Sequence, residues 1–98
     1  MDRRGIIDAL RRNEPALRAL GLRHVALFGS FAQGTANDAS DIDLLGTLDQ
    51  DKRLSLLDVV HIENVLGDVL GRKVDFVDDE SLDPRVAASV RQALIDAF

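Results

Sequence analysis

Two short motifs, Gly29-Ser30 and Asp41-Ile42-Asp43, lie ten residues apart and contain the residues best suited to chemistry. Side chains alternate between the two faces of a strand, so Asp41 and Asp43 are predicted to point the same way, with Cα atoms about 6.6 Å apart. Carboxylates at this spacing can bind one or two hard cations. Mg²⁺ suits the pattern, because it prefers oxygen ligands and usually binds through one or two carboxylates plus substrate phosphates. Without a cation, the two like charges repel and destabilise the strand.

Gly29-Ser30 is the candidate anion site. Glycine lets the backbone turn sharply and approach a phosphate, and the start of a helical turn presents free N–H groups. The Ser30 hydroxyl adds a donor. Ser40, at the other end of the loop, is expected to shape the turn into Asp41 and is a further nucleotide-binding candidate. An anion site beside a metal site is what phosphoryl or nucleotidyl transfer needs, since its catalysis is mostly positioning and electrostatic stabilisation.

Asp75 is the third acidic candidate, in a predicted strand at residues 73–77. Val74 and Phe76 point to one face of this strand and Asp75 to the other. If this strand is next to the one with Asp43, Asp75 can be a third metal ligand, or the base that takes a proton from an attacking hydroxyl. A solvated strand residue is the simpler alternative. Arg72, in the turn before this strand, is expected to be solvated, although it could also reach a phosphate.

The elements that must position these residues follow from the hydrophobic pattern. Strands are predicted at 24–28, 41–45 and 73–77, and helices at about 6–20 with a break at Pro15, at 30–33, at 53–70 and from 83 onward. The buried stripe of the long helix includes Leu57, and that of the last helix is Val86, Val90 and Leu94. This order predicts an α+β (mixed α/β) fold for one domain at 1–98, with a small mixed sheet of about three strands or slightly more, flanked by helices.

Composition narrows the function classes. The net charge of −5 argues against general nucleic-acid binding, which needs a basic surface. Six arginines against three acids in residues 1–23 are read as a solvated helix face, with a docking surface or an aid to phosphate binding as the alternative. The absence of cysteine excludes disulfides and thiolate metal sites. No apolar run is long enough for a membrane span or a secretory signal, so a cytoplasmic protein is expected.

Three blocks of the chain resemble the polymerase-beta-like nucleotidyltransferase superfamily, in particular its minimal members. They are Gly-Ser-Phe-Ala-Gln-Gly at 29–34, Ser-Asp-Ile-Asp-Leu at 40–44 and Lys-Val-Asp-Phe-Val at 73–77. The likeness covers essentially the whole chain and implies the fold of that superfamily. It also implies that Gly29 and Ser30 hold the triphosphate of ATP, while Asp41, Asp43 and Asp75 form the Mg²⁺ and catalytic site. Gln33 stands where minimal members usually have arginine, which removes one positive charge near the phosphates.

The resemblance also implies a partner protein. Minimal members are commonly the antitoxin of a two-gene module whose toxin is an all-helical ribonuclease of the HEPN type. Such an antitoxin moves AMP from ATP to a tyrosine of the toxin, in a hetero-oligomer with it. The chain has no tyrosine, so an acceptor of that kind must come from a partner. One alternative is a non-catalytic antitoxin that occludes its toxin with a vestigial nucleotide site. The least favoured is nucleotidylation of a small molecule such as an aminoglycoside, for which so short a chain has no obvious acceptor pocket.

Overall fold

A four-stranded sheet with the order β3-β2-β1-β4 forms the centre of the computed structural model, which describes residues 1–98 except the side chain of Ser89. Its strands are β1 (Leu22–Phe28), β2 (Ile42–Leu48), β3 (Val74–Asp78) and β4 (Ile95–Asp96). Strand β1 is antiparallel to both β2 and β4, whereas β2 is parallel to β3. This mixed sheet confirms the predicted fold class, and β4 is a strand that the sequence pattern does not reveal.

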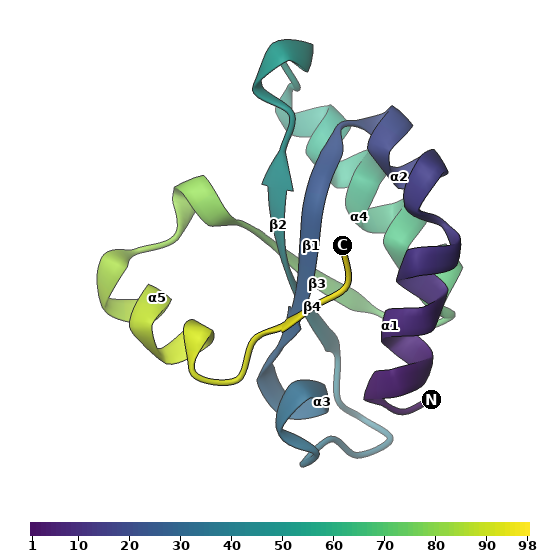
Figure 1. Cartoon of the computed structure of the whole chain (residues 1–98), viewed down its shortest axis with the longest axis vertical. Helices are drawn as coiled ribbons and strands as arrows, with labels where there is room; N and C mark the ends of the chain where they lie inside the picture. The colour runs from purple at the N-terminus through teal and green to yellow at the C-terminus, as the bar shows by residue number, and fades with distance from the viewer.

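Helices α1 (Arg3–Arg12), α2 (Glu14–Leu20) and α4 (Leu56–Leu70) pack on one another and on one face of the sheet (Figure 1). The short helix α3 (Gly29–Gln33) follows β1 directly, and α5 (Pro84–Arg91) lies apart from the other helices. The hydrophobic core lies between the helix layer and the sheet, and its fully buried members include Ile6, Leu10, Leu27, Leu44 and Leu66. Within the described part of the chain, no helix combines the length and apolarity needed to cross a membrane.

Helix α4 begins three residues later than predicted, at position 56 rather than 53. Ser55 accepts a hydrogen bond from the Asp58 N–H, and the Asp58 carboxylate accepts one from the Ser55 N–H, a capping box that sets the first turn. Leu57 was predicted in the buried stripe but is 80% exposed. It precedes the buried Ile62 by five positions, which places it about 140° around the helix from the core.

The last helix is shorter than predicted. Helix α5 ends at Arg91, so Leu94 lies outside it, and Val86 is exposed, which leaves only Val90 of the predicted stripe buried. The chain then turns back and Ile95–Asp96 pairs with β1. Further backbone hydrogen bonds join Val25 to Ala97 and Phe98. These bonds satisfy N–H and C=O groups along an edge of β1 that a longer helix would leave unpaired.

The outer edge of β3 is partly covered by a side chain of α4. The Phe76 N–H, which points away from β2, donates a hydrogen bond of 3.0 Å to the Glu63 carboxylate. On the other side of β3, the Phe76 ring lies so close to Gly46 in β2 that a Cβ there would collide with it. Strand β3 is therefore held by a carboxylate at its edge and by close packing on a glycine of its neighbour, and both contacts are made by the residue that follows Asp75.

Candidate active site

Asp43 and Asp75 lie opposite each other across the parallel strands β2 and β3. Their neighbours Ile42, Leu44 and Val74 are buried in the core, so the two carboxylates project from the opposite face of the sheet. Paired strands lie about 4.8 Å apart, which places these two side chains next to each other. The two strands are thus adjacent, as a shared role for Asp43 and Asp75 requires.

Asp43 is the half-buried member of the three acids. Burial raises the pKa of Asp43 above its ordinary value, and the negative charges of Asp75 and Asp41 raise this pKa further. Asp41 and Asp75 themselves are exposed. The Lys73 ammonium lies 3.8 Å from the Asp41 carboxylate, but both side chains are well exposed, so this ion pair offsets little of the charge.

Gly29 lies against the Asp43 carboxylate. Phe28 pairs with Asp43 across β1 and β2, and the chain then turns at Gly29 with a φ of +73°. A Cβ on this residue would collide with an Asp43 carboxylate oxygen. The left-handed backbone and the close approach therefore each require glycine. As a result, the backbone N–H groups at the start of α3, including that of Ser30, begin directly beside the carboxylates.

Ser40 shapes the turn that leads into Asp41. Its hydroxyl accepts a hydrogen bond from the Asn37 N–H (2.9 Å), and its own N–H donates to the Asn37 carbonyl (3.0 Å). The Asn37 side chain in turn accepts from the Ala39 N–H. This closed turn, residues 37–40, accounts structurally for the serine.

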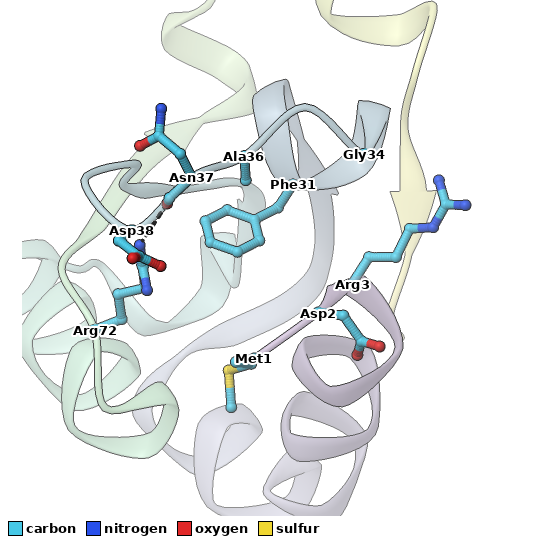
Figure 2. A pocket seen from close by; sticks show the side chains of 9 residues that line it. All are labelled: Met1, Asp2, Arg3, Phe31, Gly34, Ala36, Asn37, Asp38 and Arg72. Atoms are coloured by element: carbon cyan, nitrogen blue, oxygen red, sulfur yellow. Dashed lines mark hydrogen bonds between the residues drawn. The ribbon is translucent and has the colours of Figure 1, made fainter.

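Arg72 is not the solvated turn residue that the sequence suggests. It is half-buried, and its guanidinium donates a hydrogen bond of 2.8 Å to the Ser40 carbonyl. A second one, also of 2.8 Å, goes to the Asn37 carbonyl (Figure 2). It also lies over the Phe31 ring, 5.1 Å from the centroid. This role leaves no signal in the sequence, because the acceptors are main-chain carbonyls, which every residue has.

A cavity of about 300 Å³ lies beside the Phe31 ring (Figure 2). Its walls come from the start of α1, the loop after α3, and Arg72, whereas Asp41, Asp43 and Asp75 do not line it. Asp43 and Asp75 instead project from the sheet face opposite the core, and Asp41, predicted inside the strand, lies just before β2. The cavity and the acidic site are therefore separate features of the surface.

The acidic site has the donors that a hard divalent cation requires. All three side chains offer carboxylate oxygens. The pKa of Asp43 is raised first by burial and then by the negative charges of Asp75 and Asp41, and a bound cation would offset that charge. Among the described residues, no three acidic, histidine or cysteine side chains form a group that could hold a metal ion by themselves. The facing carboxylates of Asp43 and Asp75 fit Mg²⁺ only as part of its coordination, with substrate phosphates and water supplying the rest.

Known proteins resemble this chain over nearly its whole length. The model of the nucleotidyltransferase domain family matches residues 3–96. A protein of Methanocaldococcus jannaschii, provisionally named a protein adenylyltransferase, is 36% identical over 92 residues, or 92% of each chain. The protein adenylyltransferase MntA of Thermococcus cleftensis is 35% identical over 75 residues, 76% of this chain and 74% of its own. A chain in the crystal structure of a toxin–antitoxin with AMP-PNP is 28% identical with a TM-score of 0.70, over all of this chain and 73% of that one.

Proposed function

Because the chain belongs to the family of nucleotidyltransferase domains, we propose that it transfers AMP from ATP to a tyrosine hydroxyl of a HEPN-type ribonuclease toxin. The names of the two relatives, protein adenylyltransferases, support a protein acceptor. The similar chain crystallised with AMP-PNP in a toxin–antitoxin supports ATP as the donor and a toxin as the partner. The absence of tyrosine from this chain requires the acceptor to come from that partner. The proposal includes a hetero-oligomer of the two proteins in the cytoplasm.

The contact between Gly29 and Asp43 carries the proposal. It puts the backbone N–H groups that could hold a triphosphate directly beside a carboxylate that is paired with Asp75. A triphosphate and a cation need to be neighbours in nucleotidyl transfer, and here a turn that favours glycine lies against one carboxylate of a like-charged pair.

Each residue has a role in this proposal. The N–H groups of Gly29 and Ser30, with the Ser30 hydroxyl, hold the phosphates, and Ser40 keeps the loop closed beside them. Asp41 and Asp43 would hold Mg²⁺, with Asp75 as a third ligand or as a base. When bound, Mg²⁺ supplies positive charge that stabilises the negative charge of the phosphate oxygens.

In the reaction, the tyrosine oxygen forms a bond to the α-phosphorus of ATP. The bond between the α-phosphorus and the bridging oxygen to the β-phosphate breaks, and pyrophosphate leaves. The tyrosine proton passes to a carboxylate, and we assign this role to Asp75, which is exposed and lies opposite Asp43. The products are the tyrosyl-AMP ester on the toxin and pyrophosphate.

A transfer experiment tests this proposal. The chain, its HEPN-type partner and Mg²⁺ are incubated with ATP labelled at the α- or the γ-phosphate. We expect label on the partner only from the α-position. Label from the γ-position would indicate a kinase instead. Asp43→Asn should abolish labelling, whereas Asp68→Asn, at an exposed acid of α4, is the matched control and should not.

One observation favours a second candidate function, a non-catalytic antitoxin. Gln33 is exposed at the end of α3, where minimal members usually carry an arginine. A site without that charge would hold a triphosphate less tightly. Absence of label on the partner from either form of ATP, together with inhibition of the partner's ribonuclease activity, would support this second function over the first.

A further inference from the structure

Arg72 connects two parts of the candidate active site that are far apart in sequence. It lies in the turn between α4 and β3, and its side chain reaches the loop between α3 and β2 (Figure 2). We propose that Arg72 is a positioning residue for nucleotidyl transfer, which keeps Ser30 and Asp41 at a fixed separation. This inference rests on the proposed function, because it assigns Arg72 a part in that reaction without contact with the reacting atoms.

The contacts of Arg72 fall next to both motifs. Its Nε donates to the carbonyl of Ser40, which is bonded directly to Asp41 in the chain. Its guanidinium lies over the ring of Phe31, which directly follows Ser30. The buried Phe31 ring anchors α3 to the core, so the guanidinium connects the phosphate-binding turn to the residue before the first aspartate.

Besides Arg72, the loop is attached to the fold by the packing of Ala36 on the core and by the exposed ion pair between Lys73 and Asp41. The hydrogen bonds of the turn at 37–40 are internal to it, apart from the two from Arg72. The bond from the Thr35 N–H to the Ser30 carbonyl is local as well. Among the described residues, Arg72 therefore supplies the hydrogen bonds that join this turn to a different part of the chain.

The chemistry of the side chain suits a clamp. A guanidinium is planar and presents several donors in a fixed fork, so it can bond two carbonyls while one face stacks on an aromatic ring. A lysine ammonium has the same charge but lacks the fork and the flat face. Because Nε and one Nη already donate to carbonyls, these atoms are not available to a phosphate in this arrangement. Arg72→Lys therefore distinguishes the two roles, because it removes the paired hydrogen bonds of the clamp but keeps the positive charge that a phosphate contact needs.

The test compares wild type with Arg72→Met and Arg72→Lys, and uses Arg85→Met as the matched control. Arg85 is 90% exposed on α5, and its ion pair is with Asp83 of the same turn. The first measurement is amide hydrogen exchange over residues 34–42 in nucleotide-free protein. We expect faster exchange there in both Arg72 variants and no change in the control. Unchanged exchange in Arg72→Met, with the fold intact by circular dichroism, overturns the clamp.

The second measurement is the rate of AMP transfer to the partner at a temperature where all variants are folded. Misplacement of reacting groups by about 1 Å can lower the reaction rate by about 10²-fold. We expect a fall of that order in kcat for Arg72→Met and little recovery for Arg72→Lys. A rise in KM for ATP with unchanged kcat, restored by Arg72→Lys, overturns positioning in favour of a phosphate contact. Wild-type kcat and KM in both variants overturn the inference altogether.

The outcome remains decisive if the proposed function fails. If wild type transfers no AMP, calorimetry measures the affinity of wild type and of both Arg72 variants for AMP-PNP with Mg²⁺. Weaker binding in both Arg72 variants, with faster loop exchange, then supports a clamp that positions the nucleotide site. An affinity equal to wild type overturns it, and no binding by wild type overturns both proposals.

Discussion

Asp43 stands directly opposite Asp75 in the parallel pairing of β2 with β3, so two acids share one position of the sheet. In an ordinary strand pair, like charges at such positions are unfavourable by a fraction of a kcal/mol to about 1 kcal/mol. The partial burial of Asp43 adds to that cost. The facing acids therefore destabilise the metal-free domain, and removing one charge should raise its free energy of unfolding.

Asp43→Asn is expected to stabilise the metal-free domain at pH 7, by up to about 1 kcal/mol. Folding raises the pKa of Asp43 above its ordinary 3.8, so protonation of this carboxyl stabilises the folded state. This stabilisation is complete below pH 3.8 and is lost as the pH rises through the pKa of the folded state. The advantage of the variant should therefore shrink as the pH falls toward 3.8. Urea denaturation at both ends of this range measures it, and a lower midpoint at pH 7 would contradict the like-charge account.

Gly29→Ala is expected to destabilise the domain and to abolish transfer. The φ of +73° alone costs a non-glycine residue about 1–2 kcal/mol, and the added Cβ meets the Asp43 carboxylate. Gly34→Ala is the matched control, because Gly34 has a φ of +78° with nothing near its Cβ position. Thermal denaturation should show a larger loss for Gly29→Ala. Equal losses would mean that the contact with Asp43 is not a constraint.

Gln33→Arg is expected to tighten ATP binding. The side chain is exposed at the end of α3, and a guanidinium there could pair with two phosphate oxygens. Calorimetric titration with AMP-PNP and Mg²⁺ measures the affinity, with Gln33→Met as a control for the loss of the amide. An affinity that the arginine leaves unchanged would show that position 33 points away from the phosphates.

Asp75→Asn is expected to retain partner binding and to lose activity. The loss of a positioned proton acceptor typically lowers a rate by about 10²–10⁴-fold, whereas an exposed side chain on an intact strand contributes little to folding. A pull-down and a transfer assay on the same preparation separate the two effects. Transfer at the wild-type rate would make Asp75 a solvated strand residue. Full inhibition of the partner without transfer would show that inhibition occurs by occlusion.

The fold class and the acidic pairing follow from sequence patterns that are local. Alternating residues around Asp43 and Asp75 define two strands with acids on the non-core face, and the structure places these strands side by side. The position of Gly29 follows similarly from a glycine at the end of a predicted strand. Such features can be predicted from the sequence because each depends on residues within a few positions of one another.

Features that depend on distant parts of the chain cannot be predicted from local sequence patterns. Strand β4 consists of Ile95 and Asp96 and is too short for a periodic pattern, since the edge of β1 about 70 residues earlier determines it. The two carbonyls bound by Arg72 lie 32 and 35 positions away. The side of α4 that is buried is determined by its contacts with β3 and α1, so the exposure of Leu57 depends on residues distant in sequence.

The hydrogen bond from the Phe76 N–H to Glu63 has a consequence for how other proteins can approach the sheet. An open strand edge invites another chain to add a strand, which is a route to aggregation, and a carboxylate over such an edge discourages it. With β4 on one side of β1 and Glu63 over β3, strand addition is discouraged next to Asp75. Under the proposed function, an acceptor hydroxyl would then reach the acids from the face of the sheet that bears them and not by adding a strand at this edge.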